Sequence, residues 1–206
     1  MQEYKGENKI VLRGQAAREP IRSHQNHGVD YYLVPLRVPR LSGTDDVLNI
    51  VTADPDPGLW ATGNWVTVQG EVRSYNNRSG QGSKLVITVL ARSACSDELG
   101  EGENRLVLAG VLCRKPVVRR TPLGREICDL LLAVNRPYGR ADYLPCIAWG
   151  SLAVHCGELD VGDRLRLEGR LQSRQYHKLI DGEQVERTAF EISVMNLLPD
   201  EEDAQS

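Results

Sequence analysis

The sequence has no long apolar run, no regular cysteine spacing and no signal-like start, and each absence narrows its class. No stretch approaches the roughly 18–20 apolar residues that a membrane-spanning helix needs. The N-terminal segment MQEYKGENK is polar and lacks the apolar core of a signal peptide. The 5 cysteines are an odd number, and none forms a CxxC pair. This favours reduced thiols and a cytoplasmic location, and we expect Cys146 to be buried in an apolar strand.

Signature motifs of enzymes are also missing. The chain contains no GxxxxGK[ST] loop, no GxSxG elbow and no HExxH pair. The segment GEGEN does not end in a lysine and does not resemble a phosphate-binding loop. His24 and His27 are spaced like a ligand pair, but no cysteine or acidic partner completes a zinc site. We therefore expect no enzymatic activity, no cofactor and no metal.

The chain repeats itself once. NKIVLRGQAAREP begins at Asn8, and NRLVLAGVLCRKP begins at Asn104. The recurring residues of the first copy are Asn8, Val11, Leu12, Gly14, Arg18, Pro20, Gly28, Leu36, Val38, Arg40, Asp46 and Leu48, each found again 96 positions later. The offset becomes 99 at Gly63 and Gly70, which match Gly162 and Gly169. Two copies of such length indicate two domains rather than a solenoid.

The repeat and the charge distribution give the domain boundaries. We predict a first copy over residues 1–95, an acidic linker over 96–103, a second copy over 104–199 and an acidic disordered tail over 200–206. The second copy carries 14 Lys and Arg against 11 Asp and Glu over residues 104–198, although the whole chain has a net charge of −3. The two copies are mildly basic because eight acidic residues lie in the linker and the tail. This is only weak support for a polyanionic partner.

Each copy has the pattern of short alternating strands, and the class is all-β. In the second copy the pattern predicts strands over 105–112, 127–135, 143–149, 163–176 and 189–197, with a turn at Asp181-Gly182. The segment SLAVHCGEL predicts a short helix between the third and fourth strands. Five strands with this helix follow the order of the OB-fold, a small oligonucleotide-binding barrel. In the first copy, Pro55 and Pro57 oppose an equivalent helix.

Alternation also predicts which side chains leave the barrel. On the fourth strand, Leu165, Leu167 and Leu171 should enter the core. The opposite face is predicted to carry Arg164, Arg166, Glu168, Arg170, Gln172, Arg174 and Tyr176, unless a bend near Gly169 disturbs the count. On the third strand, Tyr143 and Trp149 fall on the outward side. A strand face with rings between arginines suits base stacking and phosphate neutralisation. The alternatives are that Trp149 lies in the core, that Tyr143 packs against a neighbouring strand, and that the arginines form a solvated face.

The second copy resembles the bacterial single-stranded DNA-binding protein family. The resemblance rests on LLAVNRPYGRADYLPCIAWGSLA and GDRLRLEGRLQSRQY and covers nearly all of residues 104–198. That family stacks bases on a few aromatic residues, and the matching positions here are Tyr138, Tyr143, Trp149 and Tyr176. The resemblance implies sequence-tolerant single-stranded DNA binding in replication, recombination or repair. We expect Arg136, Arg164, Arg166, Arg170 and Arg174 to meet the phosphates.

The first copy is similar but lacks this chemistry. Its residues at the four stacking positions are Ser42, Val47, Ala53 and Asn77. Trp65, Thr67 and Glu71 replace Arg164, Arg166 and Arg170. We therefore predict weak DNA binding on this face. The remaining rings of the first copy are expected to serve packing or a subunit interface: Tyr31, Tyr32, Trp60, Trp65 and Tyr75.

The resemblance also raises questions of assembly and partners. Family members with two OB-folds in one chain form dimers, so we expect a homodimer with four OB-folds. The family's acidic tail usually ends in an apolar tip that recruits replication proteins, but this tail ends in Ala204-Gln205-Ser206. A solubilising tail is therefore the preferred interpretation. The alternative function is a protein-interaction adaptor of the primosome type with weak nucleic-acid binding, and RNA binding is a third.

Overall fold

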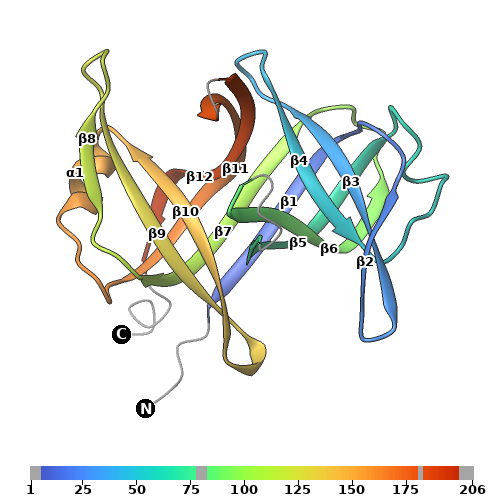
Figure 1. Ribbon diagram of the computed structural model, residues 1–206, viewed down its shortest axis with the longest axis horizontal. Coiled ribbons are helices and arrows are strands. Elements are labelled where there is room, and N and C mark those ends of the chain that lie inside the picture. Colours follow the sequence, from blue (N-terminus) through green and yellow to red (C-terminus); the bar gives the residue numbers. More distant parts are fainter. Residues whose placement is uncertain (1–5, 78–82, 181–182, 200–206) are drawn as a thin grey trace. The chain divides into compact units, whose positions relative to one another are not determined.

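A computed structural model describes residues 6–77, 83–180 and 183–199 of the chain (Figure 1). Strands dominate the described residues in both copies. The strands of the first copy are β1 (Glu7–Ala16), β2 (Ile21–Asn26), β3 (Val29–Pro39), β4 (Asp45–Thr52), β5 (Trp65–Asn76) and β6 (Leu85–Ser96). The elements of the second copy are β7 (Glu103–Leu112), β8 (Val117–Arg120), β9 (Glu126–Arg136), β10 (Arg140–Trp149), α1 (Ser151–Gly157), β11 (Arg164–Ile180) and β12 (Glu183–Leu198).

Both copies have the same strand order. The first copy runs β2-β3-β4-β6-β5-β1, and an additional β1–β3 pairing closes it into a barrel. The second copy runs β7-β11-β12-β10-β9-β8 and closes through β7–β9, where Val111 pairs with Ala133. One pairing in each copy is parallel: β4 with β6, and β10 with β12. Five strands of each copy form the OB-fold barrel that the alternation predicted, and β2 and β8 pair with β3 and β9 as one further strand in each copy. The all-β, tandem OB-fold class is confirmed.

Leucine and valine at alternating positions fill the two barrels. Leu12, Leu36 and Leu48 are fully buried in the first copy, and Leu108, Leu132 and Leu144 are their equivalents in the second. On β11, Leu165, Leu167 and Leu171 are buried as predicted. Each such side chain contributes about 1.5–3 kcal/mol when it leaves water. The duplicated core therefore explains why the apolar matches keep their register.

Close backbone approach explains two of the repeated glycine pairs. A Cβ atom on Gly14 would lie 2.3 Å from the carbonyl oxygen of Arg37, and one on Gly110 would lie 2.5 Å from that of Ala133. These contacts lie where β1 meets β3 and where β7 meets β9. Gly70 and Gly169 stand in the same relation to Leu90 and Ser193, at 2.2 and 2.4 Å. Any larger residue would push two strands apart at these points.

The copies differ between their third and fourth long strands. In the second copy α1 occupies this place, as predicted, with Ala153 and Cys156 buried. The corresponding first-copy segment forms no helix among its described residues, in keeping with its two prolines. Trp60 is fully buried there, and its indole N–H donates to the backbone carbonyl of Asp54 at 3.0 Å. An aromatic ring thus packs where the second copy has a helix.

Several element bounds differ from those expected. β8 was not predicted, because all four of its residues are exposed and no alternation marks it. β11 and β12 extend well beyond the predicted ranges, since a polar strand end carries no apolar pattern. The turn predicted at Asp181-Gly182 and the acidic tail lie outside the described residues.

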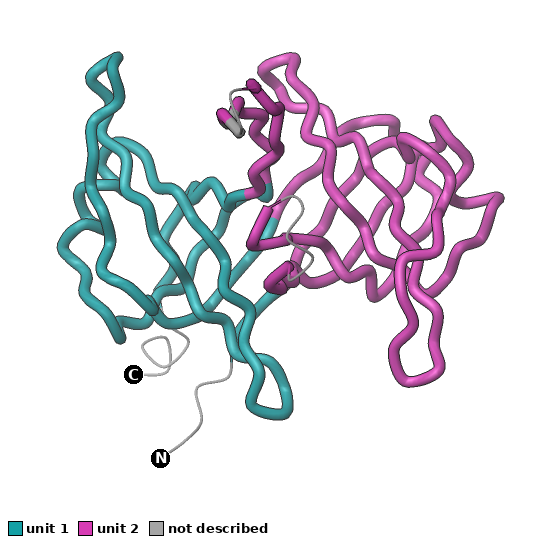
Figure 2. The backbone as a smooth tube through the Cα atoms, viewed as in Figure 1, with its two compact units in different colours: residues 1–8, 106–171, 191–206 teal, residues 9–105, 172–190 magenta. Residues whose placement is uncertain are grey.

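The two compact units of the chain do not coincide with the two copies (Figure 2). One unit contains residues 106–171 together with the chain up to Asn8 and from Glu191 onward. The other contains residues 9–105 and also 172–190, which are the outer parts of β11 and β12. The predicted boundaries at 95 and 104 therefore follow the sequence repeat, whereas the units follow packing.

The acidic linker is tied to the first copy. Asp97 accepts hydrogen bonds from the Arg13 guanidinium at 2.8 Å and from the Thr67 hydroxyl at 2.7 Å. Arg13 also pairs with Glu103 at 3.1 Å. These contacts hold the pKa of Asp97 below its ordinary value, with the Thr67 hydrogen bond as the largest cause. Two of the four linker acids, Asp97 and Glu103, thus hold the linker against the first copy, and we call these contacts the linker strap.

Candidate nucleic-acid interface

Strand β10 displays two rings on the outside of its barrel. Tyr143 is 49% exposed and Trp149 is 40% exposed, whereas Leu144, Cys146 and Ala148 between them are buried. Tyr143 pairs across the sheet with Ala133, whose small side chain leaves the phenol uncovered. Six residues of strand place the two rings roughly 20 Å apart. They are accessible to different bases, and the core alternative for Trp149 is excluded.

A third ring lies at the tip of the β9–β10 hairpin. Tyr138 is fully exposed within the short turn Pro137–Gly139. Its backbone is left-handed, with φ 66° and ψ 35°, and Gly139 follows with φ 67°. Such a conformation costs a non-glycine residue roughly 1–2 kcal/mol. The turn therefore holds an unburied aromatic residue in a strained conformation where asparagine or glycine would be more stable.

The base of this hairpin is fixed by a buried ion pair. The Arg136 guanidinium contacts both carboxylate oxygens of Asp142, which is fully buried. Arg40 and Asp46 form the same pair 96 positions earlier in the first copy. The Arg136 charge is therefore already compensated, and its contact with Asp142 secures the strands that carry Tyr138. Sequence reasoning assigned Arg136 to phosphate without finding this partner.

The arginines of β11 differ in their surroundings. Arg164 is exposed, and Arg170 is half-buried without a side-chain hydrogen bond or ion pair to the residues that the structure describes. Arg166 donates to Glu7 at 2.9 Å and reaches the carbonyl oxygen of Pro199 at 3.4 Å. Its partner Glu7 lies 159 positions away, so no local pattern revealed the pair. Arg166 therefore has its charge compensated within the protein.

The far part of β11 carries the last ring. Tyr176 is half-buried, and the guanidinium carbon of exposed Arg174 lies 5.8 Å from its ring centroid. This is a cation–π geometry that stiffens both side chains. Gln172 is buried, contrary to its predicted outward position, because Leu171 and Gln172 are both covered and strict alternation ends there. Arg174 and Tyr176 belong to the compact unit that contains the first copy.

One candidate was missed by sequence reasoning. Arg140 is exposed at the start of β10, two residues after Tyr138, and pairs in register with Arg136. It lies in the segment PYGRADY, between two stacking candidates, which is the signal that could have identified it. A cation there is well placed to meet the phosphate of a base stacked on Tyr138 or Tyr143.

The corresponding face of the first copy is built differently. Thr67 binds Asp97, and Glu71 pairs with Arg73 and with Arg92. Trp65 is half-buried, and Tyr75 is exposed on a neighbouring stretch of β5. The carboxylate of Glu71 is thus neutralised by two arginines of the first copy. Among the described residues of the chain, no group of three His, Cys, Asp or Glu side chains is arranged to hold a metal ion.

The fold and the exposed rings together define a class: a tandem OB-fold protein that displays aromatic side chains on the outside of its second barrel. Residues 103–198, which are nearly all of the second copy, match the model of the single-strand binding protein family. This match includes the residues that carried the resemblance. No helix in the described part of the chain is long and apolar enough to cross a membrane.

Individual relatives are also similar to part of the chain. Over 80 residues the chain is 38% identical to a single-stranded DNA-binding protein of Halalkalibacterium halodurans, covering 35% of this chain and 48% of the relative. It is 36% identical over 80 residues to single-stranded DNA-binding protein A of Bacillus subtilis, covering 35% and 46%. The chain thus spans about half the length of these curated relatives.

A solved structure extends the likeness to both copies. The wild-type single-stranded DNA-binding protein of Thermus aquaticus superposes with a TM-score of 0.77. It is 24% identical and covers 95% of this chain and 93% of that one. At this identity the comparison establishes the fold, and it shows that the first copy shares it despite the loss of the rings.

Proposed function

We propose that the protein binds single-stranded DNA without strong sequence preference, in replication, recombination or repair. The observation that carries the proposal is the exposure of Tyr138, Tyr143 and Trp149 on the β9–β10 hairpin. Bases would stack on these rings and on Tyr176, and each stacked base contributes about 1–3 kcal/mol. Binding requires no catalytic group. The relatives' names support this function over the adaptor alternative.

The phosphates would be met by arginines of the second copy. We assign this role first to Arg140 and Arg170, and also to Arg164 and Arg174, which are exposed. Arg136 and Arg166 already contact Asp142 and Glu7, so we give them a smaller share of the phosphate contacts. The 5 cysteines are free, which suits the reducing cytoplasm that we propose as the location.

Fluorescence titration with oligo-dT tests the proposal. Of the three tryptophans, Trp60 is buried and Trp65 is half-buried on the face of the first copy that is predicted to bind weakly. Quenching by DNA should therefore come mainly from Trp149. We expect Trp149→Phe to abolish most of the quenching while anisotropy of a labelled oligonucleotide still reports binding. Trp149→Ala should weaken binding by about 1–3 kcal/mol. Tyr75→Ala, which removes an exposed ring of the first copy, is the matched control and should bind normally.

Two results would reject the function. One is a well-folded protein that fails to bind oligo-dT at low salt. The other is an affinity that does not fall as salt rises, because phosphate neutralisation releases counterions. A parallel titration with oligo-U measures the preference between DNA and RNA.

A further inference from the structure

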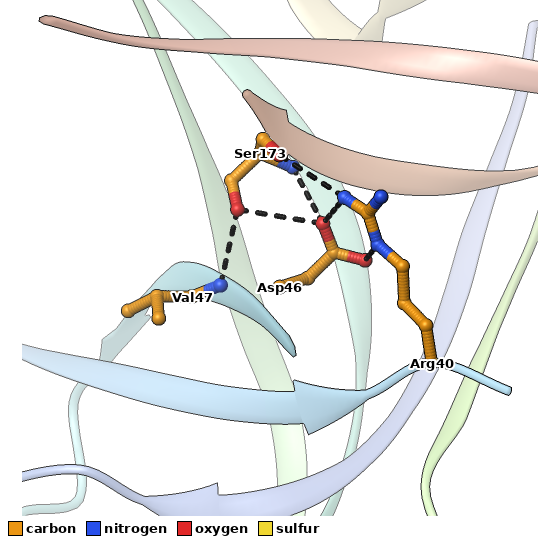
Figure 3. A network of polar contacts seen from close by, with 4 residues as sticks. All are labelled: Arg40, Asp46, Val47 and Ser173. Atoms are coloured by element: carbon orange, nitrogen blue, oxygen red, sulfur yellow. Dashed lines mark hydrogen bonds and ion pairs between the residues drawn. The ribbon is translucent and has the colours of Figure 1, made fainter. Parts of the chain in front are cut away.

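A second ion pair anchors strand β11 to the first copy. Asp46 is 1% exposed and accepts the Arg40 Nε–H at 2.7 Å, with a further contact to Nη2 (Figure 3). The Ser173 N–H donates to the same carboxylate at 2.7 Å, and Arg40 Nη2 donates to the Ser173 carbonyl at 3.0 Å. The pair therefore binds both backbone polar groups of one β11 residue.

The serine side chain completes the network. The backbone N–H of Val47 donates to the Ser173 hydroxyl at 3.1 Å. Val47 occupies the position in the first copy that corresponds to Tyr143 in the second. At this position the second copy presents a ring to solvent, whereas the first copy binds Ser173 through its backbone. The site uses a buried carboxylate, so its hydrogen bonds are directional and poorly screened by salt.

The anchored residue lies just before the stacking candidate of β11. Arg174 follows Ser173 directly, and Tyr176 is three residues beyond it, roughly 10 Å along the strand. These two side chains also stack on each other. A fixed Ser173 therefore limits the positions that the Tyr176 ring can sample. Fixing a binding group in advance reduces the ordering cost on association.

We propose that the Arg40–Asp46 pair is a positioning device for DNA binding: it anchors β11 at Ser173 and so presents Arg174 and Tyr176 to the strand. The proposal rests on the function proposed above. It gives the first copy a role in binding that needs no ring of its own. Asp46 and Arg40 act through β11 and do not touch the DNA.

The test compares Asp46→Asn with Asp97→Asn in the full chain. Both substitutions remove a carboxylate with an arginine partner in the same compact unit, but only Asp46 contacts β11. We expect Asp46→Asn to weaken oligo-dT binding by about 2- to 10-fold, the effect of releasing one or two ordered side chains. Asp97→Asn should bind like the unchanged protein.

A double-variant cycle separates positioning from general stability. If Asp46 acts through the β11 side chains, Asp46→Asn should have no further effect on affinity in the Arg174→Ala, Tyr176→Ala background. Equal additional weakening in that background would overturn the proposal. So would a normal affinity of Asp46→Asn at a temperature where circular dichroism shows it folded. If Asp46→Asn does not fold, the double variant Arg40→Ala, Asp46→Ala removes the pair without leaving a buried charge. Normal affinity of that folded double variant would likewise count against the proposal.

The unchanged protein provides the reference. If it fails to bind oligo-dT, the proposed function is wrong, whatever the variants do. If it binds and the variants of the anchor bind equally well, the function stands and the positioning role is wrong.

Discussion

At the residue scale, the alternation of apolar and polar side chains along β10 determines which rings lie outside the second barrel. Tyr143 and Trp149 are exposed because Leu144, Cys146 and Ala148 take the inward positions of the same strand. The same rule did not predict the fate of the charges. Arg166 meets Glu7, and Gln172 is covered, because such contacts depend on residues distant in sequence. The alternation along a strand indicates which face of the sheet a side chain points to, but not which residue it contacts.

Replacing Tyr138 should have opposite effects on the stability of the fold and on the affinity for DNA. Asparagine tolerates the left-handed backbone better than tyrosine, so Tyr138→Asn should raise the free energy of unfolding by roughly 1 kcal/mol. The same change removes an exposed ring and should weaken oligo-dT binding by about 1–3 kcal/mol. Urea unfolding and anisotropy titration measure the two effects. Lower stability with unchanged affinity would show that the turn conformation serves only the fold.

Arg166 and Arg170 provide a matched comparison on one strand. Arg170→Ala should reduce the slope of log affinity against log salt by about 0.7–1, as expected for the loss of one phosphate contact. Arg166→Ala removes the partner of Glu7 and should mainly lower stability, with a smaller change in the slope. Measuring affinity at several salt concentrations for both variants tests this assignment. The reverse order of slopes would mean that Glu7 releases Arg166 when DNA binds.

At the scale of elements, the long strands were predictable and their ends were not. Apolar residues alternate along the core segments of β9, β10 and β11. The helix α1 was predicted from the segment SLAVHCGEL and from its place between the third and fourth strands of an OB-fold. β8 lacks such a period because all four of its residues are exposed, and the outer part of β11 lacks one because the residues from Gln172 to His177 are polar or aromatic. The composition of residues 96–103 predicted an acidic linker but not its contacts with the first copy. Its attachment depends on Arg13 and Thr67, which no linker sequence reveals.

The linker strap should weaken in acid. A carboxyl group with a lowered pKa in the folded protein stabilises it above the ordinary carboxyl pKa and loses that effect as the pH falls through the folded value. Asp97 is such a group. The stability difference between the unchanged protein and Asp97→Asn should therefore be constant near neutral pH and shrink below pH 3.8, the ordinary pKa of an aspartate side chain. Urea unfolding across this range measures it, and a constant difference would show that Asp97 is not ionised in the strap.

At the scale of the whole molecule, the repeat and the packing divide the chain differently. The repeat locates two barrels of the same fold, which the structure and the Thermus likeness support. Residues 172–190 nevertheless group with the first copy, where Ser173 is bound. The sequence alone could not show this grouping. Ser173 lies more than 120 positions from Arg40 and Asp46, and no local pattern indicates that these residues are in contact.

The oligomeric state of the protein can also be predicted. We expect a homodimer with four OB-folds, on the resemblance to family members with two such folds in one chain. Light scattering should then give twice the chain mass of 22.9 kDa. Adding a long oligonucleotide should produce complexes whose mass corresponds to whole dimers. A monomeric mass at micromolar concentration, with DNA binding intact, would refute the expectation.

The glycines at the strand crossings have a consequence for how such a duplicated chain changes over time. Gly14, Gly70, Gly110 and Gly169 lie against neighbouring backbone, so substitution there damages the barrel itself. The stacking positions lie on the outside and carry no such steric demand. One copy can therefore lose the side chains that bind a ligand, one residue at a time, and still fold as a barrel. Such a barrel remains available for a structural role.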